Sequence, residues 1–268
     1  EFKNLFKIKY VNIKLKKRFS VSQSKEYINQ FINHERKEIS NIIEIHNRPI
    51  YLKYLNKRLN SRNYTLYFHN DPLSMEGSKS LDDRKILLNL CHRIIFNSSW
   101  SKMRFLEGLE NKYVNSEKLA VFFQSAAKGK INSIKNKKKW ITFVGKLNKA
   151  KGYDIFGKAV LRVLKKNPDW RVKIVGDEKR EQINFRHKNI DKLGFLYHKK
   201  VLNLFKVSSI AVVCSRWEEP FGRTSLEAAA NGCAVIISNK GGLPETITNA
   251  IILKKLNPKA LAGEINDL

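Results

Sequence analysis

Two uninterrupted apolar runs in the second half of the chain constrain the fold most strongly. Residues 210–215 (IAVVCS) and 233–238 (CAVIIS) lack the polar alternation of a half-exposed strand, as is typical of parallel strands covered on both faces. Between them lies a helical segment from about Arg223 to Asn231, which ends at Gly232, a residue type that often follows a helix. Strand, helix and strand in this order predict a parallel sheet with covering helices.

The same alternation extends along most of the chain. Pro49 is suited to open a helix after an early strand, and Ser98 or Ser99 to cap a later one. Residues 6–15 (FKIKYVNIKL) fit an additional edge strand. The pattern predicts strands over 41–46, 64–69, 93–97, 140–145 and 170–176, and helices over about 81–92 and 153–164.

A basic segment divides this pattern. Residues 126–139 (AAKGKINSIKNKKK) have little apolar content and many lysines, which predicts an exposed connector. We therefore expect an α/β protein with two Rossmann-like domains facing across a cleft, with any ligand at the carboxyl ends of the strands. The expected domains are 1–128 and 140–268, joined by a linker at 129–139. The first has no opening glycine-rich turn and the chain stops within a predicted helix, so we expect truncation at both ends.

Composition narrows the class of protein. A chain of 268 residues with 42% hydrophobic residues is long enough for two cores. Cys91, Cys214 and Cys233 have no pairing or metal-type spacing, which indicates free thiols in a reducing compartment. No apolar run is long enough for a membrane span. We therefore expect a cytoplasmic protein.

The charge balance leaves several interpretations open. Lys and Arg number 52 against 24 Asp and Glu, a net charge of +28. Such an excess indicates an anionic partner, or simply a chain biased toward Lys, Asn and Ile. The alternatives to an enzyme are a basic nucleic-acid-binding protein and a non-catalytic peripheral membrane protein on an anionic surface. Nucleic acid is disfavoured, because aromatic-basic interleaving, helix-turn-helix and zinc spacings are absent.

A candidate phosphate-binding turn lies between the two apolar runs. Pro220 and Gly222 shape a turn before a helix that begins near Arg223. The first N–H groups of a helix lack internal partners and suit a diphosphate. Gly241 and Gly242 predict a second turn, able to bring further N–H groups to the same place.

Two carboxylates flank this turn. Glu219 and Glu227 are eight residues apart, about 12 Å at helical rise. That is too far for an acid/base pair on one bond, but it suits two hydroxyl-bearing ends of one elongated ligand. The alternative is that Glu219 is a surface residue and Glu227 a solvated helix residue.

Two lysines follow another predicted strand. Lys146 and Lys151 lie in residues 144–152 (VGKLNKAKG), where both can project over the strand ends. Two ammonium groups there would balance the charge of a diphosphate leaving group. The sequence offers no Asp-x-Asp metal pair, so we expect no metal and no other cofactor.

Together these residues resemble the retaining GT-B glycosyltransferases of family four (glycosyl transferases group 1), which include lipopolysaccharide-core and mannosyl transferases. The resemblance rests on 219–227 (EPFGRTSLE) and 241–245 (GGLPE). It implies that Glu219 lies by the donor sugar and Glu227 by the ribose. It also places the backbone of Gly222, Arg223 and Thr224 at the diphosphate, and it puts Lys146 and Lys151 at the family's phosphate clamp, with Lys146 replacing the usual arginine.

The first half is similar to the family's acceptor domain. Residues 66–72 (LYFHNDP) place His69 at the position of the family's active-site histidine, so the resemblance implies catalytic roles for His69 and Glu219. The implied reaction moves a sugar from a nucleotide-diphosphate sugar to a hydroxyl with retention, in lipopolysaccharide or cell-surface polysaccharide synthesis. The implied acceptor is a sugar or a lipid-linked glycan.

Three departures from the family pattern bear on activity. The acceptor domain's glycine-rich first loop is absent, residues 124–130 (QSAAKGK) replace its Asn-Gly-Val-Asp, and the final crossing helix is missing. Loss of the first loop would remove part of the pocket and leave this chain inactive.

Overall fold

The computed structural model describes residues 23–59, 62–127, 131, 133 and 136–268. The edge strand expected at 6–15 lies outside these residues, as does part of the linker expected at 129–139. The chain forms two compact units. The first comprises residues up to 67 together with 72–95 and 108–119, and the second comprises 68–71, 96–107 and 120–268.

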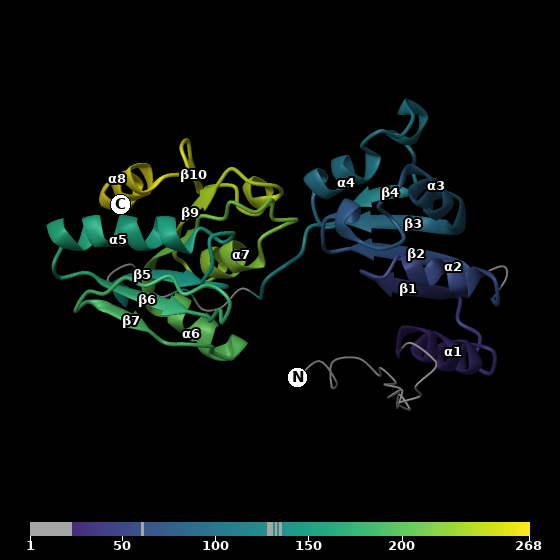
Figure 1. Ribbon diagram of the computed structural model, residues 1–268, viewed down its shortest axis with the longest axis horizontal. Helices are drawn as coiled ribbons and strands as arrows, with labels where there is room; N and C mark the ends of the chain where they lie inside the picture. Colours follow the sequence, from purple (N-terminus) through teal and green to yellow (C-terminus); the bar gives the residue numbers. More distant parts are fainter. Residues whose placement is uncertain (1–22, 60–61, 128–130, 132, 134–135) are drawn as a thin grey trace. The chain divides into compact units, whose positions relative to one another are not determined.

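A four-stranded sheet occupies the first half of the chain (Figure 1). Its strand order is β1-β2-β3-β4, and β1 and β2 pair in parallel. The strands are β1 (Ile42–His46), β2 (Asn63–Phe68), β3 (Cys91–Phe96) and β4 (Leu119–Val121), and the helices are α1 (Gln23–Glu35), α2 (Ile50–Asn56), α3 (Leu81–Leu90) and α4 (Ser99–Leu106).

The helix starts follow from local capping. Pro49 precedes α2, and the Ser98 side chain accepts a hydrogen bond from the Ser101 N–H at the start of α4, as both residue types predicted. The helix predicted over 81–92 is two residues shorter. It ends at Leu90 because Cys91 is already extended and buried as the first residue of β3.

A six-stranded sheet forms the core of the second unit. All its strand pairs are parallel, and their order is β10-β9-β8-β5-β6-β7. The strands are β5 (Lys138–Val144), β6 (Arg171–Val175), β7 (Ile190–Lys192), β8 (Ser208–Val213), β9 (Ala234–Ser238) and β10 (Ile251–Leu253), and the helices are α5 (Tyr153–Lys166), α6 (His198–Val207), α7 (Arg223–Ala230) and α8 (Pro258–Asn266).

The two apolar runs become β8 and β9, in the interior of this sheet. Buried side chains of α5 and α8 pack on one face, and those of α6 and α7 pack on the other. Both faces of each strand are therefore covered, which explains why the sequence shows no polar alternation there.

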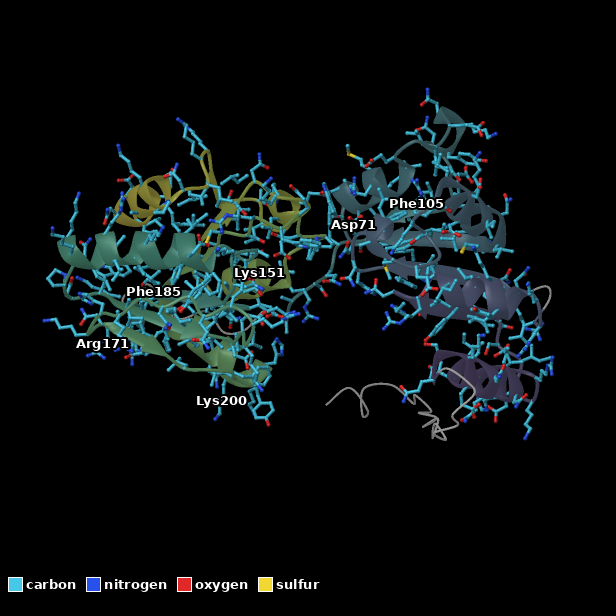
Figure 2. The ribbon with its side chains drawn as sticks, in the orientation of Figure 1. Asp71, Phe105, Lys151, Arg171, Phe185 and Lys200 are labelled. Carbon is cyan, nitrogen blue, oxygen red and sulfur yellow. The ribbon has the colours of Figure 1, made fainter. Side chains whose placement is uncertain are left out.

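Three stacked or tilted phenylalanines hold two further segments of the second unit. Phe68, Phe96 and Phe105 have ring centroids 5.3 to 5.7 Å apart, and all three are buried. Figure 2 labels Phe105. Such aromatic groups contribute both buried area and favourable ring geometry. The cluster fixes the segments that carry His69 and Asn97.

Candidate functional site

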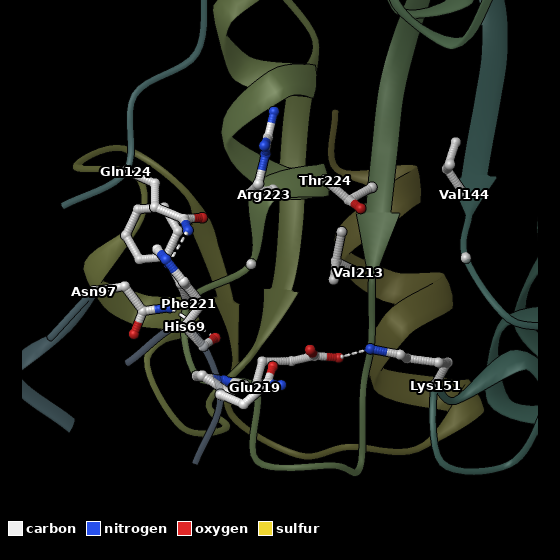
Figure 3. Close-up of a pocket in the computed structure, with 14 residues that line it drawn as sticks. His69, Asn97, Gln124, Val144, Lys151, Val213, Glu219, Phe221, Arg223 and Thr224 are labelled. Carbon is white, nitrogen blue, oxygen red and sulfur yellow. Dashed lines mark hydrogen bonds and ion pairs between the residues drawn. The ribbon is translucent and has the colours of Figure 1, made fainter. Parts of the chain in front are cut away.

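A pocket of about 310 Å³ opens in the second unit (Figure 3). It lies at the carboxyl ends of β5 and β8 and at the start of α7, where ligands bind in open parallel sheets. Its wall consists of His69, Asn70, Asn97, Gln124, Val144, Gly145, Lys151, Val213 and residues 219–224. Six residues singled out from the sequence thus meet in one cavity: His69, Lys151, Glu219, Gly222, Arg223 and Thr224.

An ion pair joins two of these residues. The Lys151 Nζ lies 2.5 Å from the Glu219 Oε1, and the Glu219 side chain is only 12% exposed. Glu219 is therefore not a solvated surface carboxylate. Lys146, expected beside Lys151, is exposed and does not line the pocket.

The start of α7 presents unpaired backbone donors. The N–H groups of Ser225 and Leu226 donate to the Gly222 carbonyl. Within the described part of the chain, the N–H groups of Arg223 and Thr224 have no acceptor. They coincide with the positive end of the helix dipole, so this edge of the pocket suits an anion.

Gly222 is required by the shape of this turn. Its φ is +115°, and a Cβ there would lie 2.4 Å from the Leu243 Cδ2. Only glycine adopts this conformation readily, which gives the turn a reason for glycine independent of any ligand.

Glu227 is held by the side chains of an arginine and a histidine. Its Oε1 accepts a hydrogen bond from the Arg223 Nη2 at 2.9 Å and lies 3.0 Å from the His198 Nε2. The Glu227 side chain is 11% exposed, so the interpretation of a solvated helix residue is wrong. Glu227 does not line the 310 Å³ pocket. Sequence reasoning assigned no role to His198, because its partner is 29 residues away and no spacing pattern links them.

The Gly241–Gly242 turn acts on the glutamate segment. The Gly241 N–H donates to the Glu218 carboxylate at 2.5 Å, and the Gly242 N–H donates to the Glu219 carbonyl at 2.6 Å. In the structure these donors are used within the chain. Their contribution to a ligand site therefore runs through the backbone position of Glu219.

His69 has a partner that sequence reasoning missed. Its Nδ1 lies 3.0 Å from the Gln124 Nε2, and its carbonyl accepts from the Asn97 Nδ2 at 3.0 Å. Because an amide N–H₂ only donates, the Gln124 side chain is the donor in this contact. Gln124 and Asn97 both follow a strand end, which is the signal that could have found them.

The start of α4 is tied to the same turn region. The Ser98 hydroxyl donates to the Pro220 carbonyl at 2.5 Å. The Glu245 carboxylate accepts the N–H groups of Ser99 and Trp100 at 2.6 and 2.8 Å. A carboxylate over the first turn of a helix is favourable, and this one links the last residue of the GGLPE segment to α4.

Metal-binding clusters and membrane-spanning helices are both absent from the described residues. No group of three or more His, Cys, Asp or Glu side chains there is arranged to hold a metal ion. No helix among those residues has the length and apolar content needed to cross a membrane.

The family model described as glycosyl transferases group 1 matches residues 125–268, more than half of the chain. The chain belongs to this family. The GT-B resemblance is therefore confirmed.

Relatives in sequence match at most about half of the chain. Spore coat protein SA of Bacillus subtilis is 34% identical over 148 residues, which cover 49% of this chain and 39% of the relative. The lipopolysaccharide core biosynthesis mannosyltransferase LpsB of Rhizobium meliloti is 26% identical over 121 residues, 41% of this chain and 34% of the relative. The matches thus cover well under two thirds of these relatives.

Solved structures share the fold over most of the chain. HepE from Anabaena in complex with UDP has a TM-score of 0.74 at 17% identity, covering 90% of this chain and 71% of that one. A glycosyltransferase from Rickettsia africae has a TM-score of 0.70 at 19% identity, covering 95% and 73%. At these identities the likeness shows the fold, an α/β architecture of the GT-B type.

Proposed function

We propose that the chain acts in the transfer of a sugar from a nucleotide-diphosphate sugar to a hydroxyl acceptor, with its second unit binding the donor. One observation carries the proposal: the Lys151–Glu219 ion pair lines one pocket together with Arg223 and Thr224, whose N–H groups have no acceptor among the described residues. A diphosphate needs positive groups, and a sugar needs a hydrogen-bond acceptor for its hydroxyls. This pocket offers both.

The charge of the leaving diphosphate is balanced by the protein itself. The Lys151 ammonium and the α7 start supply positive charge where negative charge develops, the electrostatic need of this reaction. Lys146, on the same loop, adds to the field from outside the pocket wall. We propose that these groups suffice without a metal or other cofactor, and that transfer proceeds with retention at the anomeric carbon. The anomeric configuration of the product, followed by proton NMR during turnover, tests retention.

We propose separate roles for the two carboxylates and for His69. Glu219 faces the pocket and accepts hydrogen bonds from the donor sugar, while Glu227 accepts from the ribose. His69 lines the same pocket and serves the reacting sugar. HepE binds UDP and UDP-glucose, so uridine diphosphate sugars are the first donors to test.

The acceptor is proposed as a sugar or a lipid-linked glycan of the cell surface. The likeness to LpsB supports a role in lipopolysaccharide synthesis, and the net charge of +28 supports attachment to an anionic surface. We propose peripheral attachment to the inner face of the cytoplasmic membrane. Co-sedimentation with anionic vesicles, lost at high salt, is expected, and equal sedimentation with neutral vesicles would contradict it.

A thermal-shift screen against UDP-, GDP- and ADP-sugars tests the donor proposal. A ligand that binds only the folded state raises the melting temperature, so one nucleotide class should raise it in the wild type. The shift should vanish in Lys151→Met and persist in Lys139→Met, because Lys139 pairs with Asp169 at the surface. A wild-type chain that responds to no nucleotide sugar would overturn the proposal.

A further inference from the structure

One loop carries the Lys151 ammonium to the pocket. Residues 146–152 connect β5 to α5, and Lys151 donates from its Nζ to Glu219. A lysine ammonium lies at the end of a flexible four-carbon side chain and has no fixed hydrogen-bonding geometry. The position of its ammonium therefore depends on how well the loop backbone is held.

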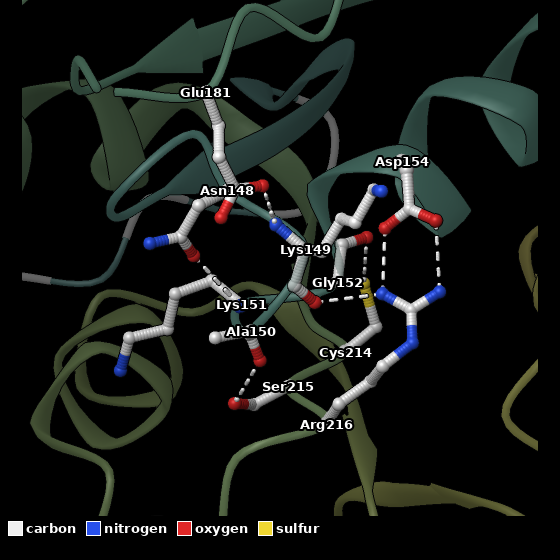
Figure 4. A network of polar contacts seen from close by, with 10 residues as sticks. All are labelled: Asn148, Lys149, Ala150, Lys151, Gly152, Asp154, Glu181, Cys214, Ser215 and Arg216. Atoms are coloured by element: carbon white, nitrogen blue, oxygen red, sulfur yellow. Dashed lines mark hydrogen bonds and ion pairs between the residues drawn. The ribbon is translucent and has the colours of Figure 1, made fainter. Parts of the chain in front are cut away.

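The end of β8 provides the holding contacts (Figure 4). The Ala150 carbonyl accepts the N–H groups of Arg216 and Trp217 at 2.8 and 3.0 Å, and the Ser215 hydroxyl at 3.1 Å. Its neighbour, the Lys149 carbonyl, accepts the Arg216 Nη1 at 2.7 Å. Two consecutive carbonyls of the loop thus depend on residues 215–217.

Arg216 also reaches the helix that follows the loop. Its Nη1 and Nη2 donate to the two carboxylate oxygens of Asp154 at 2.6 and 2.8 Å. Asp154 lies in the first turn of α5, whose apolar face is buried in the core. A bidentate arginine–carboxylate pair has a defined geometry as well as opposite charges. The Arg216 guanidinium therefore connects the loop to the first turn of α5.

The backbone on either side of Lys151 is conformationally restricted. Gly152 has a φ of +72°, and a Cβ there would lie 1.9 Å from the Cys214 carbonyl oxygen. On the other side, the Lys151 N–H donates to the Asn148 Oδ1 at 3.0 Å. The backbone at Lys151 is therefore held by the Asn148 side chain on one side and restricted by Gly152 on the other. Arg216 adds a hydrogen bond to the Lys149 carbonyl of the same loop.

We propose that Arg216 is a positioning residue of the donor site: it orders residues 146–152 so that the Lys151 ammonium meets the diphosphate. Arg216 does not line the pocket, so it acts through Lys151 and contacts no ligand. This inference rests on the proposed donor binding. The hydrogen bonds from Arg216 also lower the pKa of Asp154, as a persistent ion pair does.

Calorimetric titration of the chain with UDP, and in parallel with uridine, tests the role. Arg216→Ala is expected to weaken UDP binding about tenfold, the equivalent of about 1.4 kcal/mol, and to leave uridine binding unchanged. Arg216→Lys should give a smaller loss, because lysine cannot replace the bidentate fork. Lys139→Ala breaks a surface ion pair of similar length and should leave both affinities unchanged.

A double-mutant cycle separates positioning from general structure. In the Lys151→Met background, Arg216→Ala should weaken UDP binding less than twofold further, because the group it positions is gone. Equal losses in both backgrounds, or equal losses for UDP and uridine, would overturn the inference. If Arg216→Ala does not fold, Arg216→Lys and Asp154→Asn carry the same cycle. A wild-type chain that binds no UDP, GDP or ADP overturns the proposed function itself, whereas UDP binding unaffected by the Arg216 variants overturns this inference alone.

Discussion

Glu219→Gln is expected to tighten the binding of UDP while it lowers turnover. In the structure the Lys151 ammonium pairs with Glu219 at 2.5 Å, so an incoming diphosphate competes with that carboxylate for the same lysine. Glutamine keeps the size of the side chain and one acceptor oxygen but removes its charge. UDP carries no donor sugar, and it therefore loses no contact with Glu219.

The size of the effect follows from the exposure of the pair. Two unit charges about 4 Å apart interact by about 4 kcal/mol at the effective dielectric constant near protein surfaces, and fully exposed pairs contribute about 1 kcal/mol or less. Lys151 is 33% exposed and Glu219 is 12% exposed, which places this pair between the limits. A net gain of about 1.5 kcal/mol corresponds to roughly tenfold tighter binding.

Isothermal titration with UDP at low and high salt measures this gain. The difference between Glu219→Gln and wild type should shrink as salt screens the partly exposed charges. Asp169→Asn is the matched control, because this surface carboxylate pairs with Lys139 instead and the loss of its charge should leave UDP affinity unchanged. Lys151→Met should weaken UDP binding.

The Glu219→Gln variant should keep the melting temperature of the wild type. If such a variant binds UDP no more tightly than the wild type, the prediction is wrong. That result would show that Glu219 and the diphosphate do not share Lys151. Turnover measured in parallel should fall at least a hundredfold, a size of loss known for removing one charge-stabilising group. Full turnover in this variant would remove Glu219 from the reaction.

Three further predictions address the same unit. His198→Ala should weaken uridine and UDP binding about threefold by titration calorimetry, because it removes one of the two side chains that hold the Glu227 carboxylate, at a mostly exposed position. Unchanged affinity would show that His198 does not act on the ribose site. Gly222→Ala should lower the free energy of unfolding by about 1–3 kcal/mol, because alanine is strained at a φ of +115°, and the melting temperature should fall by several degrees. Gly263→Ala in α8, where a Cβ meets no atom within 4 Å, should leave the melting temperature unchanged. Equal melting temperatures for the two variants would show that Gly222 is not required by its backbone conformation. The Arg216 guanidinium lowers the pKa of Asp154 from its ordinary 3.8, so its stabilisation is present above that pH and is lost as the pH falls through the lowered pKa. The stability advantage of wild type over Asp154→Asn in urea should therefore be larger at about pH 6 than at about pH 3, and a constant difference would contradict the ion pair.

The sheet of the second unit could be predicted where strands are buried on both faces. The runs at 210–215 and 233–238 gave β8 and β9 to within two residues, because burial on two faces leaves an unambiguous apolar signal. The edge strand β7 could not be predicted, because two of its three residues, Ile190–Lys192, are charged. Helix α6 was missed for a related reason: it is rich in lysine, and only Val201 and Phe205 are buried.

The candidate site divides in the same way. Glu219, Gly222 and the start of α7 could be placed from local spacing, because a turn and a helix start are properties of neighbouring residues. The contacts of His198 with Glu227 and of Gln124 with His69 join residues 29 and 55 positions apart. Such pairs are set by the packing of whole elements, which a single sequence does not display.

The two glutamates share one arrangement, which explains how acidic groups coexist with a diphosphate site. In each, Oε1 pairs with a cationic side chain, Lys151 for Glu219 and Arg223 for Glu227, and the Glu227 Oε1 also contacts His198. Within the described part of the chain, neither Oε2 has a partner. A bare carboxylate beside a diphosphate would repel it, whereas a paired one exerts a much smaller net field and still offers an oxygen to a hydroxyl. Each pairing therefore reduces the repulsion between the carboxylate and the phosphates. It also leaves one carboxylate oxygen available to accept a hydrogen bond from the sugar or the ribose. On this argument the tenfold gain expected from Glu219→Gln is bounded from above, because most of the repulsion is already cancelled by Lys151.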